Sequence, residues 1–258
     1  MTKHLTKTVA PVVFLIAVSL ASCVTNKKLT YLQYDGSLSD TVVAVTPADY
    51  KILPYDNLYI KVVTPDPKWS EMFNALPVTS FSISTTELSA GLVSYPVDGS
   101  GNIRLPYAGT ILVAGKTLAA VTTEVEEALK DYVADAAVSV KMINNYVSLI
   151  GEVQKPGRYP IYKDRLNIFQ ALAMGNDLTE FSDRQKIQII RQTTGGNIVK
   201  EFSLADRSIM SSEFFYVMPN DVIYAQPVKG RFFRMNTFPY SVVLSTITTF
   251  VLIWNVVK

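Results

Sequence analysis

The chain has 258 residues, of which 48% are apolar, and a formal net charge of +2. This length allows one large domain or two small ones, each with a hydrophobic core. Lys3 and Lys7 lie in a segment that we expect to be removed, and the rest of the chain then carries balanced charge, which gives no electrostatic reason to expect a nucleic-acid partner.

The N-terminus has the pattern of a secretory signal. A basic start precedes an apolar run over residues 9–20, which is too short for a comfortable membrane span. The run ends in LASC at residues 20–23, a pattern that resembles a bacterial lipobox. We therefore predict a lipoprotein signal peptide over residues 1–22 and acylation of Cys23, in preference to an ordinary signal with a chance cysteine.

Removal of this segment restricts the chemistry of the mature chain. His4 is the only histidine and Cys23 is the only cysteine. Zinc sites built on His and Cys, internal disulfides and Ser–His or Cys–His nucleophile pairs are therefore excluded. An enzyme would have to use carboxylates, lysine or tyrosine. The acidic pair Glu126–Glu127 lies on a predicted helix, where adjacent residues do not face each other, and we predict neither catalysis, a metal nor a cofactor.

Residues 23–48 are polar and irregular, which predicts a lipidated tether. The apolar alternation over residues 58–62 predicts a half-buried strand, preceded by a turn at Pro54 and Tyr55. Residues 64–94 are rich in proline and serine, so we expect a long loop with weak structure of its own.

The next stretch, residues 95–117, has the pattern of a hairpin. Asp98, Gly99 and Gly101 supply the residue types that tight turns with positive φ require. Thr117 is a suitable N-cap for an amphipathic helix, and a strand follows that helix at residues 136–143.

A second unit begins with alternating apolar residues that end at Gly151. Pro156 and Gly157 predict a type II turn in which Gly157 takes a positive φ. Residues Ile168–Met174 predict a short helix that ends at Gly175. Three strands follow, at residues 186–192, 198–204 and 219–227. A small sheet crossed by one helix is an α+β pattern.

These motifs resemble a known family. YKILPYDNLYIKV, YPVDGSGNIRLPYAG and the following GKT resemble the polysaccharide export domain of outer-membrane polysaccharide export lipoproteins. LIGEVQKPGRYPI, ALAMGND, IIRQ and PNDVIYA resemble a soluble-ligand-binding β-grasp domain, known as SLBB. The resemblance implies an export domain over residues 49–143 and one SLBB-like β-grasp domain over residues 144–229.

The sequence departs from the family pattern at three turns. Family members often carry glycine where this chain has Tyr55, Asn176 and Asn220. Asparagine tolerates the left-handed region better than most residues, so we expect Asn176 and Asn220 to keep the family's turns. Tyrosine does not share this tolerance, so we expect the turn at Pro54 to be type I.

The resemblance also implies a role. Such proteins form homo-oligomeric rings that conduct capsular polysaccharide or exopolysaccharide through the bacterial outer membrane. They are lipid-anchored there, their bodies are mainly periplasmic, and they work with an inner-membrane polysaccharide copolymerase and its tyrosine kinase module. The alternatives are a surface or periplasmic glycan-binding lipoprotein with a C-terminal anchor helix and, as an enzyme, a glycan lyase or hydrolase that uses carboxylates.

Residues 237–258 predict a C-terminal amphipathic membrane helix. At helical spacing, a stripe interrupted by Leu252 contains the pore-lining candidates Ser241, Ser245, Thr248 and Asn255. The opposite face contains the lipid-facing candidates Val243, Ile247, Phe250 and Trp254. The helix by itself is equally consistent with an anchor and a pore lining, a helix-packing face of small residues is a further alternative, and the family resemblance favours the pore.

Overall fold

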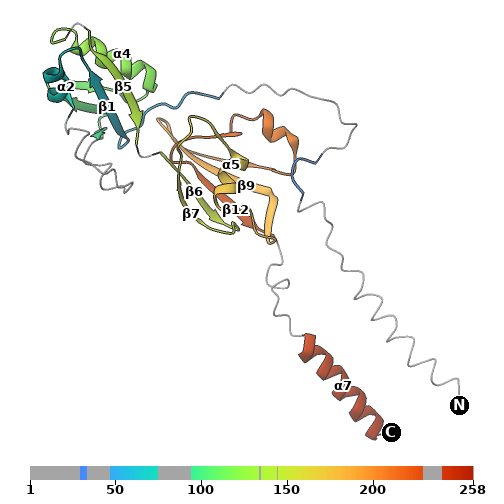
Figure 1. The fold of residues 1–258 in the computed structure, drawn as a ribbon. Coiled ribbons are helices and arrows are strands. Elements are labelled where there is room, and N and C mark those ends of the chain that lie inside the picture. The colour runs from blue at the N-terminus through green and yellow to red at the C-terminus, as the bar shows by residue number, and fades with distance from the viewer. Residues whose placement is uncertain are drawn as a thin grey trace.

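The computed structural model describes residues 30–33, 47–74, 94–133, 135–143, 145–228 and 240–257. The chain forms two α+β lobes, and a helix, α7, lies near its C-terminus (Figure 1). Each lobe has a hydrophobic core of its own. One core draws on residues between Ile52 and Val140, and the other on residues between Val147 and Ala225.

The described residues of the first lobe form a three-stranded antiparallel sheet, a separate hairpin and two helices. The sheet has the order β2-β1-β5, and the hairpin is β3-β4. The elements are β1 (Asn57–Val63), α2 (Pro67–Phe73), β2 (Tyr95–Pro96), β3 (Asn102–Leu105), β4 (Gly109–Leu112), α4 (Leu118–Leu129) and β5 (Ala137–Met142).

Strand β1 and helix α4 form where the sequence predicts them. In β1, alternate residues are buried, which is the pattern of a half-buried strand. Helix α4 begins after Thr117, whose side chain accepts a hydrogen bond from the backbone N–H of Ala120 at 3.2 Å. The helix buries Val121, Val125 and Leu129, which lie one turn apart on one face.

The predicted loop over residues 64–94 is wrong in part, because residues Pro67–Phe73 form helix α2. Asp66 caps it by accepting from the N–H of Lys68 at 2.9 Å, and Pro67 occupies its first turn. Proline favours this position because the first N–H groups of a helix have no partner within the helix. Residues 75–93 of the predicted loop lie outside the described residues.

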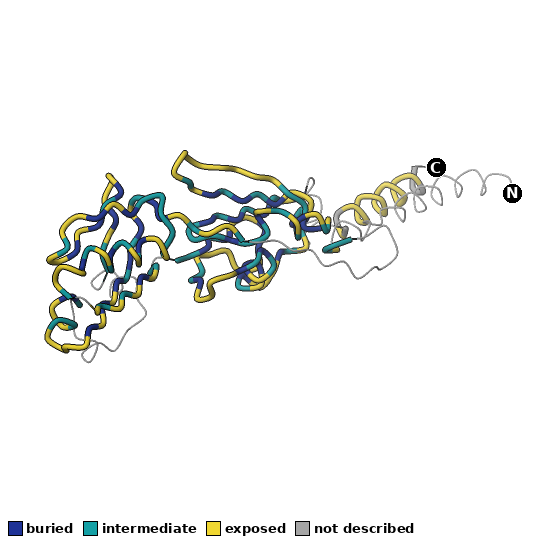
Figure 2. Tube along the Cα trace, turned by 90° about the horizontal axis from the view of Figure 1, so that it is seen from above, coloured by how far each residue is buried: buried dark blue, intermediate teal, exposed yellow. Residues whose placement is uncertain are grey.

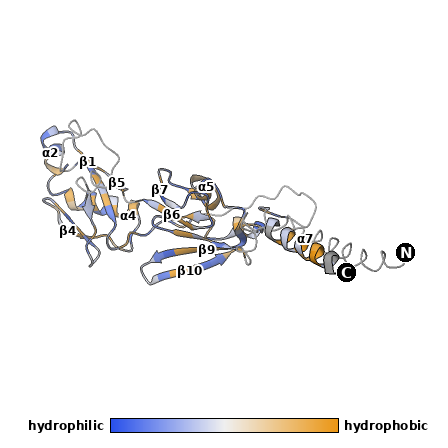
Figure 3. Ribbon diagram, turned by 90° about the horizontal axis from the view of Figure 1, so that it is seen from below, coloured by the Kyte–Doolittle hydropathy of each residue, from blue (hydrophilic) through white to orange (hydrophobic). Residues whose placement is uncertain are grey.

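The second lobe is a five-stranded mixed sheet with the order β10-β9-β12-β6-β7. Figure 3 labels four of these strands, β6, β7, β9 and β10. Its first and last long strands, β6 and β12, pair in parallel, and its other pairs are antiparallel. The elements are β6 (Tyr146–Gly151), β7 (Gly157–Pro160), β8 (Leu166–Asn167), α5 (Ile168–Met174), β9 (Ser182–Thr193), β10 (Gly196–Phe202), the 3₁₀ helix η3 (Arg207–Ser211), β11 (Tyr216–Val217) and β12 (Val222–Pro227).

Helix α5 has the predicted bounds because local signals define both of its ends. Asn167 accepts from the N–H of Gln170 at 2.9 Å, and the Gln170 side chain accepts from the N–H of Asn167 at 3.0 Å. At the other end, Gly175 is the C-cap but has φ −87, and the following Asn176 takes the left-handed conformation with φ 59. The prediction that Asn176 keeps a positive-φ turn is confirmed.

A short part of the predicted tether is bound to the second lobe. The N–H groups of Leu32 and Gln33 donate to the carbonyls of Leu204 and Ala205 at 3.0 and 2.6 Å. The hydroxyl of Tyr31 donates to Asp177 Oδ1 at 2.5 Å. Residues 30–33 are therefore irregular, as predicted, and they also pack against the second lobe, a contact that the prediction did not include. Residues 34–46 lie outside the described part of the chain.

Helix α7 (Tyr240–Val257) has 18 residues. All of its described side chains are exposed, among them Leu244, Phe250 and Trp254 (Figure 2). Within the described residues, no helix has both the length and the apolar character needed to cross a membrane. The predicted C-terminal helix is thus present, and its predicted transmembrane character is not supported by this finding.

Candidate functional site

The predicted hairpin turn at residues 98–102 is organised by Asp98. Its Oδ1 accepts from the N–H groups of Ser100 and Asn102 at 2.8 and 2.9 Å. Gly101 has φ +84, and a Cβ there would lie 2.4 Å from the Cβ of Ala114, so only glycine fits. The prediction of a positive φ is confirmed at Gly101 and wrong at Gly99.

Gly99 is adjacent to a second turn. A Cβ on Gly99 would lie 3.0 Å from the hydroxyl oxygen of Tyr55, so the absence of a side chain leaves room for this tyrosine. Tyr55 itself has φ 72, and the N–H of Asp56 donates to the carbonyl of Leu53 at 3.2 Å. A positive φ at the second central position characterises a type II turn, so the predicted type I turn is wrong.

Asp56 holds this turn in place from within the lobe. It is buried and accepts from the N–H of Leu53 at 2.9 Å and from the hydroxyl of Tyr50 at 2.8 Å. Burial, together with the charge and hydrogen bond of Asp56, raises the pKa of Tyr50. The N–H of Val97 donates to the carbonyl of Asp56 at 2.8 Å, which joins the turn to the hairpin.

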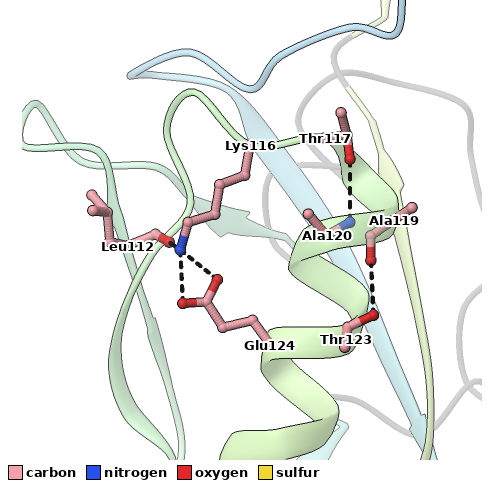
Figure 4. A network of polar contacts seen from close by, with 7 residues as sticks. All are labelled: Leu112, Lys116, Thr117, Ala119, Ala120, Thr123 and Glu124. Atoms are coloured by element: carbon pink, nitrogen blue, oxygen red, sulfur yellow. Dashed lines mark hydrogen bonds and ion pairs between the residues drawn. The ribbon is translucent and has the colours of Figure 1, made fainter.

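The GKT stretch joins the hairpin to helix α4 (Figure 4). Lys116 Nζ donates to the carbonyl of Leu112 at 2.6 Å and to Glu124 Oε1 at 2.7 Å. Gly115 has φ +78, which turns the chain before the helix. The three motif residues therefore have structural roles: a bend, a bridge to α4 and, at Thr117, the helix cap.

The predicted type II turn with a positive φ at Gly157 is wrong. The glycine with a positive φ in this part of the chain is Gly151. Gly157 lacks a positive φ and begins strand β7, where a Cβ would make ordinary contacts of 3.6 Å or more with Tyr159. Gly151 instead has φ +85, and a Cβ there would lie 2.2 Å from the carbonyl oxygen of Ala225. The parallel pairing of β6 with β12 therefore requires glycine at position 151.

Asn220 has the predicted positive φ, 64, and leads into a buried ion pair. The next residue, Asp221, accepts from Arg191 Nε and Nη2 at 3.0 and 2.8 Å. Both side chains are buried, and Asp221 also accepts from the N–H of Met218 at 2.7 Å. Sequence analysis missed this pair because nothing local to strand β9 indicates a partner for Arg191, although Arg191 shares the buried face of Ile187 and Ile189.

The apolar face of α7 contains the predicted aromatic pair and also a hydroxyl group, and one residue of the polar stripe has an undescribed side chain. Phe250 and Trp254 stack on one face, with ring centroids 6.4 Å apart. Helical spacing also brings Thr246 next to Phe250, so the apolar face carries a hydroxyl that the prediction omitted. Asn255 belongs to the helix backbone, and its side chain lies outside the described residues.

The hydroxyl groups of α7 bond within the helix. The threonine Oγ1 atoms donate to main-chain carbonyls one turn earlier: Thr246 to Val243 at 2.8 Å, Thr248 to Leu244 at 2.5 Å and Thr249 to Ser245 at 2.7 Å. Such bonds satisfy the donors without water. The stripe is thus compatible with an anchor, a packing face or a pore lining.

Two further predictions concern lipidation and metal binding. Cys23 lies outside the described residues, as does the signal peptide over residues 1–22. In the described part of the chain, no group of three or more His, Cys, Asp or Glu side chains is placed to hold a metal ion.

Comparison with known proteins finds a family match for the first lobe. Residues 44–143 match the family model described as polysaccharide biosynthesis/export protein. The match covers less than half of the chain. The matched segment contains the Tyr55 turn, the hairpin and helix α4 described above.

Curated relatives agree with this assignment. The EPS I polysaccharide export outer membrane protein EpsA of Ralstonia nicotianae is 30% identical over 152 residues, which are 55% of this chain and 38% of that protein. The protein of the same name from Ralstonia solanacearum is 30% identical over 118 residues, 44% of this chain and 31% of its own length. The exopolysaccharide production protein ExoF of Rhizobium meliloti is 32% identical over 96 residues, 36% of this chain and 23% of its own length. This chain therefore spans well under half the length of these relatives.

Proposed function

We propose that this protein exports an exopolysaccharide or capsular polysaccharide across the outer membrane. The observation that carries the proposal is the family match over residues 44–143, which coincides with a structural unit that has its own hydrophobic core. The relatives named as polysaccharide export outer membrane proteins support the substrate class and the membrane. The role is transport, without bond chemistry on the polymer.

In this proposal the working form is a homo-oligomeric ring. Polymer has to pass a barrier without being cleaved, and a closed ring of identical subunits supplies a continuous path. The family resemblance further suggests that the ring receives polymer from an inner-membrane copolymerase with a tyrosine kinase module. The second lobe, residues 144–229, is proposed as an SLBB-like β-grasp domain because its sheet is crossed by one helix and pairs its first and last long strands in parallel.

Attachment to the outer membrane is proposed through two elements. Acylated Cys23 anchors the N-terminus, since the lipobox pattern places the only cysteine at the processing site. Copies of α7 pack side by side, with Ser241, Ser245 and Thr248 toward a water-filled lumen and Phe250 and Trp254 toward lipid. A helix in such an assembly does not need to be apolar all round, because its polar side faces the lumen.

A gene deletion combined with imaging tests the proposal. Deletion is expected to abolish secreted or surface polymer, and the full-length gene is expected to restore it. Protein extracted in detergent from the outer-membrane fraction is expected to form rings in electron micrographs. Normal polymer secretion by the deletion strain would refute the export role. A monomeric protein that binds polymer and is not needed for secretion would establish the alternative, a glycan-binding lipoprotein.

A further inference from the structure

Four aromatic side chains form a continuous row on the export domain. Trp69 and Phe73, one turn apart on α2, stack with ring centroids 6.0 Å apart. Phe73 meets Tyr107 edge to face at 5.5 Å, and Tyr107 lies 6.2 Å from Tyr132. The row thus joins three separate parts of the lobe: α2, the turn between β3 and β4, and the segment after α4.

The row is anchored in the core at one member and open to solvent at two others. Phe73 is only 1% exposed, whereas Tyr107 and Tyr132 are 51% and 45% exposed. Trp69 is partly buried against the same core. Phe73 therefore fixes the position of the row, while the two tyrosines present ring surface and hydroxyl groups to the surroundings.

Tyr107 is held in this position against its backbone preference. It has φ 66, a left-handed conformation that disfavours residues with a Cβ. The turn also contains Gly109, with φ +76, so glycine is used at one strained position and a large aromatic residue at the other. Strain of this kind persists where the surrounding contacts maintain it, and it occurs preferentially at functional positions.

The chemistry of the row suits sugar rings. A pyranose has apolar C–H faces and a rim of hydroxyl groups, and tyrosine and tryptophan offer an apolar ring with a polar handle at its edge. The rings of Trp69, Tyr107 and Tyr132, joined through buried Phe73, are spread over three parts of the lobe instead of lining a single pocket, which fits a polymer of sugars. All four residues lie within the segment that matches the polysaccharide export family.

We infer that Trp69, Tyr107 and Tyr132, positioned by the buried ring of Phe73, form a contact surface for the sugar rings of the transported polysaccharide. The inference rests on the proposed export function and adds to it a substrate-binding surface on the first lobe. The polymer slides along exposed tyrosine rings, which bind C–H faces without requiring one particular sugar sequence.

The test uses a double variant, Tyr107→Asn with Tyr132→Asn, in the full-length protein. Asparagine tolerates the left-handed backbone at position 107, so this variant removes the ring without adding strain. The control is Tyr162→Asn, which removes a tyrosine that is 84% exposed in the second lobe. The conservative variant Tyr107→Phe with Tyr132→Phe retains both rings.

Polymer purified from the medium of the wild-type bacterium is the probe, and binding to the detergent-solubilised protein is measured by affinity electrophoresis. The double asparagine variant is expected to bind at least about tenfold more weakly, with an unchanged or higher melting temperature. The control and the phenylalanine variant are expected to bind within about threefold of the wild type. Equal binding by the asparagine variant and the wild type would overturn the inference, as would failure of the wild type to bind polymer.

Secretion by the complemented deletion strain separates this inference from the proposed function. If deletion leaves secretion normal, the export function itself fails. If deletion stops secretion and the asparagine variant restores it fully, only the aromatic surface fails. Loss of rings in the asparagine variant, measured by electron microscopy, would instead assign the row to a contact between subunits and overturn the inference.

Discussion

Arg191 and Asp221 form a two-pronged ion pair inside the second lobe, with Nε–Oδ1 and Nη2–Oδ2 distances of 3.0 and 2.8 Å. Arg191 Nη2 also donates to the carbonyl of Tyr216 at 2.9 Å, and its guanidinium lies 5.0 Å from the ring centre of Phe214. The pair joins strand β9 to the turn before β12. Because strand β12 lies between β9 and β6, the pair fixes the centre of the sheet.

The first prediction is that breaking this pair is more damaging than replacing it. Asp221→Ala leaves a buried guanidinium without its partner, so the free energy of unfolding is expected to fall by about 3–5 kcal/mol. The double variant Arg191→Met with Asp221→Leu removes both charges and is expected to lose less. Urea unfolding followed by near-ultraviolet circular dichroism measures both. A double variant that loses as much as Asp221→Ala, or more, would contradict this account.

The second prediction compares two glycines of the second lobe. Gly151→Ala places a Cβ within 2.2 Å of the carbonyl oxygen of Ala225 at φ +85, so it is expected to lose more than about 2 kcal/mol. Gly157→Ala adds only ordinary contacts with Tyr159 and is expected to lose less than about 1 kcal/mol. Thermal unfolding of the two variants provides the comparison, and equal losses would show that the β6–β12 contact is not the constraint.

These glycines also show which features of the fold follow from local sequence. Helices α4 and α5 were predictable because Thr117 and Asn167 cap them and their apolar residues lie at helical spacing. The positive φ of Asn220 was predictable from residue type. The role of Gly151 was not, because its need for glycine comes from Ala225, which pairs with it only after folding. The Pro156–Gly157 dipeptide favours a turn in isolation, and strand pairing overrides that preference.

In the candidate sites, too, features held by short-range hydrogen bonds were predictable, and features held by contacts between distant residues were not. The Asp98 turn was predictable because its hydrogen bonds reach only to residues 100 and 102. The bond from Tyr31 to Asp177 and the Arg191–Asp221 pair join residues 146 and 30 positions apart, so no local pattern indicates them. The aromatic contacts of Tyr107 with Phe73 and Tyr132 were missed for the same reason.

The third prediction concerns the strained turn at Tyr55. This side chain is 77% exposed at φ 72, so it gains little from burial while its backbone is disfavoured. Tyr55→Asn is expected to raise the free energy of unfolding by about 0.5–1 kcal/mol. Tyr162→Asn, at an exposed position without positive φ, is the matched control and is expected to have no effect. A destabilised Tyr55→Asn variant would show that the ring's contact at Gly99 outweighs the strain.

The fourth prediction concerns lipidation. Metabolic labelling with a fatty-acid analogue is expected to label the wild type and to leave Cys23→Ala unlabelled, because position 23 holds the only thiol in the chain. The unlabelled variant is expected to leave the outer-membrane fraction in part, since a single lipid anchor gives marginal binding and α7 is the second proposed attachment. Label on Cys23→Ala would refute acylation at this position.

The last prediction concerns the two faces of α7. If Thr248 faces a lumen and Phe250 faces lipid, a positive charge is tolerated at one position and not at the other. Near the centre of a membrane, a lipid-facing lysine costs about 2.5–3.5 kcal/mol, whereas a lysine in a lumen stays hydrated. Thr248→Lys is therefore expected to keep membrane association and to alter polymer export, while Phe250→Lys is expected to reduce membrane association.

A structural control is available at the same position. The Thr248 hydroxyl bonds to the carbonyl of Leu244, so Thr248→Val removes a bond within the helix while keeping the side-chain shape. It is expected to leave both association and export unchanged, which assigns any effect of Thr248→Lys to the charge.

Cysteine scanning decides between a pore and an anchor. Cysteine is introduced at single positions of α7 in a chain that keeps Cys23, and intact rings are treated with a membrane-impermeant thiol reagent. Positions 241, 245 and 248 are expected to react, because a lumen admits water and the reagent. Positions 247, 250 and 254 are expected to be protected, because lipid excludes the charged reagent. Equal protection of the two sets would make α7 an anchor or a packed helix. Equal reaction would place α7 in water.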